Sequence, residues 1–576
     1  MVMIEENNCK KNESTENGNP SFEQIRRNKR FYVDKTGFIR TWWNKGNSVD
    51  LILRPEGFGK SLNLDMVDCF FSKQYEGRQE LFEGLEINKD KDLIRLQGSK
   101  PVIRISFSHV MEGKLGNITD AMIPQIDSIF LKYLYVLDGD NLDNVSKDIF
   151  IETRKALADG CITNLIDSIR TLSHILYKYH KEKVIILIDD YDAPLLKAWI
   201  DEDYKEISEF FRLFYGNTLK SNPFLEKALL TGISRLCKES MYTDMNHVVV
   251  SGMTEKAFSN YFGFTEKEVF STMDSYCLTD KEAVNAFYGG YHMGDMENMY
   301  HPQAISSYLE TGRIENNWMN TSSQKMIEKL LRLSDVPFKM YLEELLLGKD
   351  IMVKLYKNTV FSDLDIGNTK RADTSSVCAL LYETGYLKAV DFDLASGKFT
   401  LRVTNAESEI MLEHMINRWF YDSGERNYKD FVHAMLSGDV KSMKDALKDI
   451  YKESFSVFEI NGRIYAKSAE NFYRGFFLCL ITRLRKEYRI SSNKESSRGR
   501  YDCILEPLDD AKKAVVIEFK VRKNKEANLK EAAEDALEQI KKMRYKEELK
   551  KRGFSDEQIL CYGIAFDGKE TMVLMA

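Results

Sequence analysis

Short apolar runs alternate with longer amphipathic stretches along the first half of the chain. The runs "VDLIL", "PVIRISFS", "KVIILID" and "ALLTG" are each separated from the next by a stretch with helical spacing. Short apolar runs indicate buried strands, and strands alternating with helices indicate a parallel sheet with helices on both faces. The pattern therefore predicts an α/β fold for this part of the chain.

The pattern changes twice further along. Within a helical section, "SSVCALLYETGYLKAVDFDLASGKFTLRVTN" predicts a helix, a glycine turn and two strands. This order fits a winged helix, and it fits an ordinary α+β connector equally well. Near the end, "AENFYRGFFLCLITRLRKEY" predicts a helix and "SSNKESSRGR" a polar loop. Strands "YDCILEP" and "KAVVIEFKV", the helix "LKEAAEDALEQIKKMRYKEELKKR" and the strand "ILCYGIAF" follow.

A glycine-bearing loop, "RPEGFGKS", joins the first predicted strand to a helix. Its candidate binding residues are Gly57, Gly59, Lys60 and Ser61. Phosphate-binding loops (P-loops) use backbone N–H groups and a lysine for the phosphates, and a hydroxyl for magnesium. The usual pattern has a further glycine where this chain has Arg54, so the match is incomplete. The loop still predicts a nucleotide site at the start of the helix.

Acidic and polar residues close two other predicted strands. "VIILIDD" ends in Asp189 and Asp190. A strand beside the loop would bring Asp189 to magnesium, directly or through water, and Asp190 would orient the attacking water. In "ALLTGISRL", Thr231 or Ser234 would sense the γ-phosphate and Arg235 would contact phosphate. Acids that merely cap a strand give the same pattern.

The strand "VVIEFKV" carries an acid and a base on one face. Glu518 and Lys520 are two residues apart, so their side chains point the same way. Asp502 opens the preceding predicted strand, and antiparallel pairing would bring it beside Glu518. Metal-dependent phosphodiester cleavage needs such carboxylates and a group that activates water. The alternative is a solvated ion pair on an edge strand, but the apolar residues before Glu518 argue against exposure.

Six segments occur in one order: "YVDKTGFI", "RPEGFGKSL", "LIDDYDAPL", "LTGISRL", "FGFTEKEV" and "LLYETGYL". Together they resemble the bacterial AAA-ATPase-like proteins that carry a C-terminal PD-(D/E)xK nuclease domain. The resemblance implies ATP and Mg²⁺ as cofactors, with Mn²⁺ as an alternative ion. That family typically has "RPRRFGKS" and "DEYD", whereas this chain has Glu56 and Gly57 for the arginine pair and Asp190 for a glutamate.

The resemblance also implies roles near the end of the chain. The acids and lysine described above would form the D…ExK triad, with Glu470 as a further metal ligand. Gln539 and Tyr545 lie in "QIKKMRY", which resembles a segment on the helix after the triad. Gln539 would orient Lys520 or contact DNA.

Composition narrows the class of protein. The chain has 576 residues, 43% of them hydrophobic and 30% charged, and a formal charge of −7. No apolar run approaches the roughly 18 residues of a membrane span, and the polar start lacks a secretory signal. Nine scattered cysteines without a CxxC pair indicate reduced thiols and no zinc site. These features predict a cytoplasmic protein with no membrane contact.

Basic residues gather around the D…ExK motif despite the acidic total. They are Arg483, Arg485, Lys486, Arg489, Lys494, Arg498, Arg500, Lys512, Lys513, Arg522, Lys523 and Lys525. A phosphate-rich polymer is the natural partner of such a cluster, which leaves DNA and RNA open, and the resemblance implies a nucleic acid with DNA favoured. For the basic residues that lie in the predicted helix, an ordinary solvent-exposed helix face is an equally good explanation.

We expect an α/β multidomain protein built from four parts. These are a disordered tail (1–20), a P-loop AAA-ATPase-like domain (21–290), a helical and winged-helix-like region (291–445) and a PD-(D/E)xK nuclease-like, restriction-endonuclease-like domain (450–576). The leading hypothesis is an ATPase that also carries a magnesium-dependent nuclease, whose activity is gated by the bound nucleotide. A nucleotide-switched DNA-binding or signalling protein with an inactive nuclease fold, and an ATPase that remodels a protein partner, remain alternatives. The sequence leaves a homo-oligomer open.

Overall fold

The computed structural model describes most of the chain as two compact units. It leaves undescribed residues 1–20, 109–114, 202, 221, 236–247, 317–321, 335, 347, 356–371, 422–424, 456–476, 478–479, 493–494, 497–498, 501–502, 510, 522–527, 544 and 568–569. The first unit comprises Met1–Lys329 and Val353–Ser408, and the second comprises Leu330–Met352 and Glu409–Ala576. No helix among the described residues is both long and apolar enough to cross a membrane.

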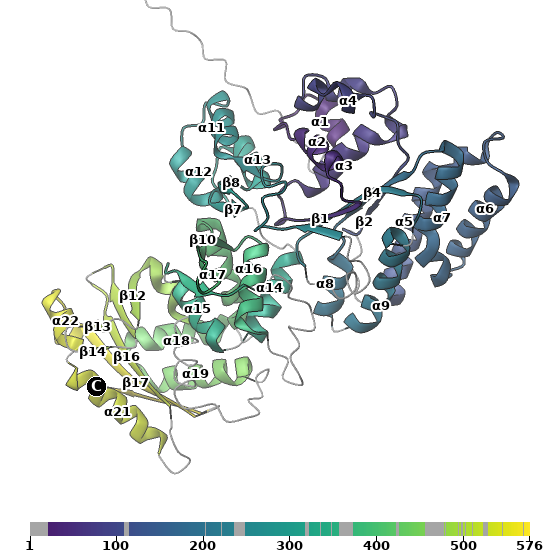
Figure 1. The fold of residues 1–576 in the computed structure, drawn as a ribbon. Coiled ribbons are helices and arrows are strands. Elements are labelled where there is room, and N and C mark those ends of the chain that lie inside the picture. The colour runs from purple at the N-terminus through teal and green to yellow at the C-terminus, as the bar shows by residue number, and fades with distance from the viewer. Residues whose placement is uncertain are drawn as a thin grey trace, which may run out of the picture. The chain divides into compact units, whose positions relative to one another are not determined.

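A five-stranded parallel sheet organises the first unit (Figure 1). Its strands are β1 (Val49–Leu53), β2 (Val102–Ser106), β3 (Val184–Asp189), β4 (Leu225–Gly232) and β5 (Val248–Ser251). Their spatial order is β2-β3-β4-β1-β5, and every neighbouring pair runs parallel. The predicted parallel sheet is confirmed. The placement of the acidic strand directly beside the loop strand is wrong, because β4 pairs with both and lies between β1 and β3.

Helices cover this sheet. They are α1 (Phe22–Arg27), α2 (Gly37–Asn44), α3 (Lys60–Phe71), α4 (Lys91–Ile94), α5 (Leu115–Lys132), α6 (Asn144–Ala158), α7 (Ile162–His180), α8 (Ala193–Ile200) and α9 (Tyr204–Tyr215). An aromatic-rich core joins α1–α4 to the sheet and includes Phe38, Trp42, Phe70 and Phe71. This packing fixes the position of α3, which begins at Lys60 directly after the glycine loop.

The chain then forms smaller elements. They are β6 (Phe264–Thr265), α11 (Glu266–Ser275), α12 (Lys281–Tyr288), β7 (Tyr291–Met293), β8 (Met296–Tyr300), α13 (Pro302–Thr311), α14 (Ser322–Leu333), α15 (Val336–Leu346), β9 (Ile351–Val353), α16 (Thr374–Glu383), β10 (Leu387–Asp393), β11 (Lys398–Val403) and α17 (Ala406–Tyr421). The predicted helix, glycine turn and hairpin correspond to α16, β10 and β11, and the two strands pair antiparallel.

The second unit contains a mixed sheet. Its elements are α18 (Glu425–Ser437), α19 (Val440–Phe455), β12 (Tyr488–Ser492), β13 (Glu495–Ser496), β14 (Gly499–Arg500), β15 (Cys503–Pro507), β16 (Ala514–Val521), α21 (Leu529–Lys542), α22 (Tyr545–Lys551), β17 (Ile559–Asp567) and β18 (Glu570–Met575). The sheet order is β12-β15-β16-β17-β18, and only β16 and β17 pair in parallel.

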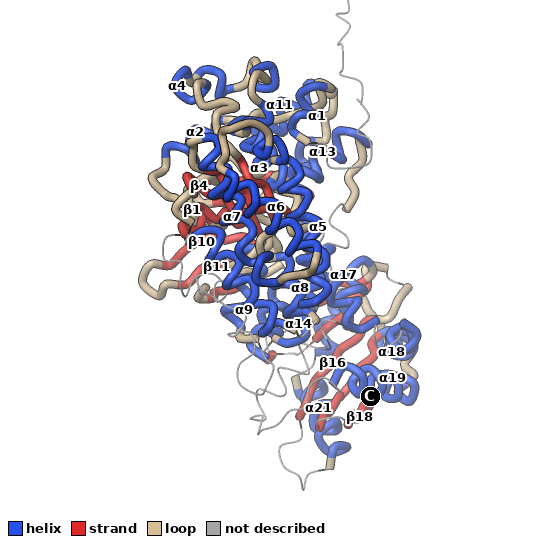
Figure 2. The backbone as a smooth tube through the Cα atoms, turned by 90° about the vertical axis from the view of Figure 1, so that its right-hand side faces the viewer, coloured by secondary structure: helices blue, strands red, loops and turns tan. Residues whose placement is uncertain are grey.

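Helices cover both faces of this sheet (Figure 2). The Tyr562 hydroxyl donates to the Met435 carbonyl of α18, whereas a Cβ on the next residue, Gly563, would meet α21. Successive strand residues face opposite ways, so α18 and α21 lie on opposite faces. Val516 packs beneath α21 and α22. Glu518 and Lys520 follow it at intervals of two residues along the strand, so their side chains lie on the same face of the sheet as α21.

Three expectations for this unit are corrected. The predicted polar loop contains the short strands β13 and β14, whose polar residues carry no apolar signal. The single predicted helix breaks after Lys542, and Tyr545 opens α22 with its side chain in the core. Strand β18 extends the sheet beyond the last predicted strand.

Short turns complete the described structure. The 3₁₀ turns are η1 (Lys73–Tyr75), η2 (Gln79–Phe82), η3 (Glu86–Lys89), η4 (Leu134–Leu137), η7 (Thr482–Lys486) and η8 (Asp556–Gln558), and η5 (Gly216–Lys220) is a π-helical turn.

Candidate functional site

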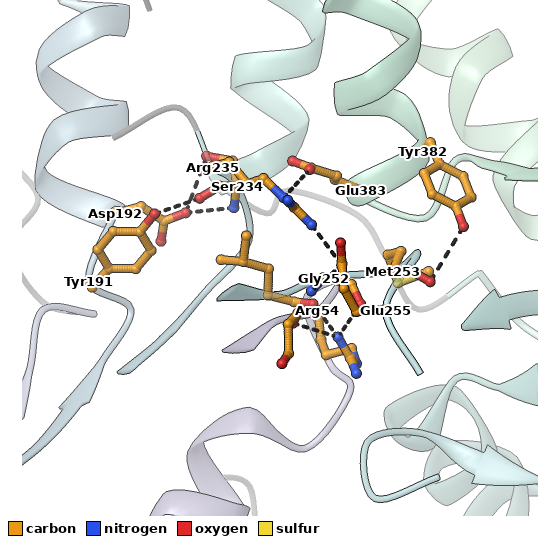
Figure 3. A network of polar contacts seen from close by, with 12 residues as sticks. Arg54, Tyr191, Asp192, Ser234, Arg235, Gly252, Met253, Glu255, Tyr382 and Glu383 are labelled. Carbon is orange, nitrogen blue, oxygen red and sulfur yellow. Dashed lines mark hydrogen bonds and ion pairs between the residues drawn. The ribbon is translucent and has the colours of Figure 1, made fainter. Parts of the chain in front are cut away.

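Arg54 occupies the position of the missing glycine and has a structural task. Its side chain is fully buried, and its Nη1 donates to the carbonyl oxygens of Leu53 (2.7 Å), Ser251 (3.0 Å) and Gly252 (2.9 Å) (Figure 3). Burial lowers the pKa of this guanidinium to about 10, so it stays charged at neutral pH. Arg54 therefore ties the carboxyl ends of β1 and β5 together, a role that glycine cannot fill.

The loop after β1 presents a cradle of free donors. Within the described structure, none of the backbone N–H groups of residues 56–61 donates to a protein acceptor. Gly59 has a φ of 80°, which lets the chain turn sharply into α3. The Lys60 Nζ lies back over the loop and donates to the carbonyl oxygens of Arg54 and Pro55, both at 2.9 Å. Such a cradle at a helix N-terminus fits phosphate oxygens.

Acids from β3 lie at the same carboxyl edge of the sheet. Asp189 is 3% exposed, and the Thr231 hydroxyl donates to its Oδ1 at 2.7 Å. Asp190 has a φ of 51°, in the left-handed region that aspartate tolerates better than glutamate. Burial, reinforced by the charge of Asp189, raises the pKa of Asp190 to about 7. The backbone conformation gives a physical reason for the shorter acid at this position.

Asp192 was missed by the sequence analysis. Its Oδ2 accepts from the backbone N–H groups of Ile233 (2.9 Å) and Ser234 (2.8 Å), and burial raises its pKa to about 6. The Ser234 hydroxyl also lies 3.4 Å from this oxygen (Figure 3). The candidate sensor Ser234 therefore faces Asp192. The signal available in the sequence was the third acid of "DDYD".

Arg235 lies among carboxylates just after β4. Its Nη2 is 2.7 Å from Glu255 and its Nε is 3.0 Å from Glu383 on α16 (Figure 3). Burial raises the pKa of Glu383 to about 7, although the charge of Arg235 opposes this. The structure thus places the candidate phosphate contact Arg235 in ion pairs that join the sheet edge to α16.

In the second unit, the acid and base of "VVIEFKV" lie in the middle of the sheet. The Glu518 side chain is 2% exposed and that of Lys520 is 24% exposed, with Nζ 3.7 Å from Oε1. Gln539 of α21 donates from its Nε2 to the same Glu518 oxygen. A carboxylate buried in this way needs hydrogen-bond donors, and Gln539 supplies one. The exposed edge-strand alternative does not describe this pair.

Two candidate metal ligands, Asp502 and Glu470, lie outside the described residues. The register of β15 on β16 begins with Cys503 opposite Ile517, the residue before Glu518. Among the described residues, no three acids, histidines or cysteines gather as a metal site.

A cleft of about 800 Å³ borders this site. Its lining residues are Lys520, Asp535, Glu538, Gln539, Lys541, Lys542 and Met543. The sequence analysis missed Lys541 and Lys542, although Lys542 lies three residues after Gln539 on one helix face.

Among the described residues of the predicted basic cluster, several lie away from the acid–lysine pair. Lys512 and Lys513 precede the opposite end of β16, whose first residue, Ala514, lies roughly 13 Å from Glu518 at about 3.3 Å per residue. Lys512 pairs with Glu487, and Arg485 lies 3.0 Å from Glu409. The prediction that Lys512 and Lys513 lie close around the acid–lysine pair is therefore wrong. The side chains of Arg483, Lys494, Arg498, Arg500, Arg522, Lys523 and Lys525 lie outside the described residues.

Fold and site together define a chain with a nucleotide-type parallel α/β domain and a second domain with a nuclease-type mixed sheet. Residues 17–242 match a family described as "Predicted AAA-ATPase", and residues 468–575 match the "PD-(D/E)XK nuclease superfamily". The chain therefore has the architecture that its motifs resemble: an AAA-ATPase-like domain and a C-terminal PD-(D/E)XK nuclease domain.

A relative of similar length is a protein of Azotobacter chroococcum mcd 1 described as "Uncharacterized protein in vnfD 5'region". It is 23% identical over 546 residues, which cover 93% of each chain. The similarity thus extends over both domains.

Proposed function

We propose that this protein binds and hydrolyses ATP at the edge of the first sheet, and cuts DNA in a magnesium-dependent reaction at Glu518 and Lys520. The observation that carries the proposal is the hydrogen bond from Gln539 to the buried Glu518, beside a lysine that reaches an open cleft. The two family matches support hydrolase chemistry in both domains.

At the nucleotide edge, the free N–H groups of residues 56–61 would bind the phosphates together with Lys60. The Ser61 hydroxyl and Asp189 would hold Mg²⁺, which when bound neutralises charge on the transferring phosphoryl group. Thr231 already orients Asp189 through its hydroxyl. Asp190, next in the chain, would accept a hydrogen bond from the attacking water.

At the nuclease edge, Glu518 and Asp502 would hold Mg²⁺, with Glu470 as a further ligand. Asp502 directly precedes Cys503 in the sequence, and Cys503 pairs with Ile517, the residue before Glu518. The bound ion would polarise the phosphodiester and its attacking water. Lys520 would orient that water or donate to a phosphate oxygen, while Gln539 holds the Glu518 carboxylate in place.

Lys541 and Lys542 favour a phosphate polymer in the cleft, because lysines bind backbone phosphates without regard to sequence. We further propose that nucleotide state at Lys60 gates cleavage. The support for gating is the presence of both domains in one chain.

A cleavage assay tests this function. Plasmid and single-stranded DNA are incubated with the full chain and Mg²⁺ or Mn²⁺, with and without ATP, beside Glu518→Gln and Lys60→Ala. Cleavage that Glu518→Gln abolishes supports the nuclease, and equal activity of the two proteins refutes it. Unchanged rate and ATP dependence in Lys60→Ala would refute gating alone.

A further inference from the structure

One buried histidine holds the phosphate loop from far along the chain. His301 is fully buried at the start of α13, and its Nδ1 accepts a hydrogen bond from the Ala304 N–H at 3.1 Å. Burial lowers the pKa of His301 to about 3, so the ring is neutral near pH 7. With Nδ1 accepting, the ring proton lies on Nε2, which donates to the Glu56 carbonyl oxygen at 3.0 Å.

The same ring fills the space beside Gly57. A Cβ at residue 57 would lie 2.4 Å from the His301 Cε1 and 2.6 Å from its Nε2, closer than any side chain can approach. Gly57 also has a φ of 74°, which favours glycine. The glycine at this position therefore gives His301 its access to the loop.

Two further residues of the phosphate loop, Phe58 and Glu56, also contact the part of the chain around His301. The Phe58 ring packs edge-on against His301, with centroids 5.1 Å apart, and against Tyr291 at 4.8 Å. The Glu56 carboxylate accepts from the Ser323 N–H at 3.2 Å, at the start of α14. Glu56, which replaces an arginine of the related motif, is therefore hydrogen-bonded to the start of both α13 and α14.

We propose that His301 is a positioning residue for nucleotide binding, which keeps the N–H groups of the phosphate loop turned toward the phosphates. In a planar trans peptide, the carbonyl of one residue and the N–H of the next point in opposite directions. The bond from His301 holds the Glu56 carbonyl on the α13 side, so the Gly57 N–H points to the other side, into the cradle. This inference rests on the proposed ATP site.

The test measures ATP affinity of the full chain by calorimetry. His301→Asn keeps an N-cap for α13, because asparagine caps helices well, but removes the ring and its bond to Glu56. We expect its Kd for Mg-ATP to rise about tenfold, the worth of one buried hydrogen bond. Gly57→Ala leaves His301 in place and inserts a methyl group into its ring, so it should weaken binding at least as much.

His174→Asn is the matched control. This histidine stacks on Phe224, which precedes β4 and so lies at the amino edge of the sheet, opposite the loop. The Kd of His174→Asn for Mg-ATP should equal that of the wild type.

A merely structural role for His301 would lower the melting temperature and leave the Kd of the folded protein unchanged. A wild-type Kd in both His301→Asn and Gly57→Ala would overturn the inference while the ATP site stands. Absence of ATP binding in the wild type would overturn the proposed function together with it. In steady state, the KM for ATP should rise more than kcat falls.

Discussion

The approach of α21 to β17 at Gly563 should control the nuclease site. Gly563 pairs with Glu518 in the sheet register. A Cβ there would lie 2.3 Å from the Ala533 carbonyl oxygen and 3.0 Å from the Leu537 Cγ. Non-bonded carbon contacts prefer roughly 3.5 Å, so Gly563→Ala must push α21 away by about 1 Å. Gln539 moves with that helix and should lose its hold on Glu518.

We expect Gly563→Ala to reduce the DNA cleavage rate about 100-fold, the usual cost of a displacement near 1 Å at a reacting group. Overpacking should also destabilise the fold by about 1–3 kcal/mol. Single-turnover cleavage and thermal melting measure the two effects separately. Leu549→Ala is the control, because it should destabilise by about 2–5 kcal/mol through the core beneath α22 without displacing α21. A folded Gly563→Ala that cleaves at the wild-type rate would refute this account of Gln539.

Three further changes give distinct results. Gln539→Leu should slow cleavage by about 10- to 100-fold, since it leaves buried Glu518 without this donor, and Kd for DNA should change little. Asp190→Asn should abolish ATP turnover with ATP affinity and melting temperature preserved, whereas Asp190→Ala should cost about 1 kcal/mol more stability at φ 51°. Burial raises the pKa of Glu383 from 4.5 to about 7 against the opposing charge of Arg235, so the folded protein retains a proton that the unfolded chain loses. The unfolding free energy should therefore fall as pH rises from about 4.5 to 7, by up to about 3 kcal/mol, and denaturant titrations of Glu383→Gln should lack this component.

Much of the fold could be predicted from short local patterns in the sequence. The apolar run before "RPEGFGKS" and the glycines within it predict β1, the loop and the start of α3, because each signal acts over a few residues. The position of β4 between β1 and β3 was not predictable in this way, since strand order depends on packing between distant segments. The break between α21 and α22 also escaped prediction, because the helical spacing of apolar residues continues across it.

In the two sites, too, local features could be predicted from the sequence and contacts between distant segments could not. The pairing of Glu518 with Lys520 follows from strand geometry, and the structure adds their burial and the contact with Gln539. In the sequence Arg54 is a departure from a glycine pattern, and its structural role is evident only from its carbonyl partners in the folded chain. His301 had no signal near the loop that it contacts, because the two are neighbours only in the folded chain.

The most direct test of the central claim is the metal-dependent cleavage of DNA by the full chain beside Glu518→Gln, a change that keeps the side-chain size and removes the carboxylate charge. The account predicts cleavage with Mg²⁺ or Mn²⁺ that chelation of the metal stops and that Glu518→Gln loses. Cleavage that is the same in the two proteins, or that survives chelation, would contradict it.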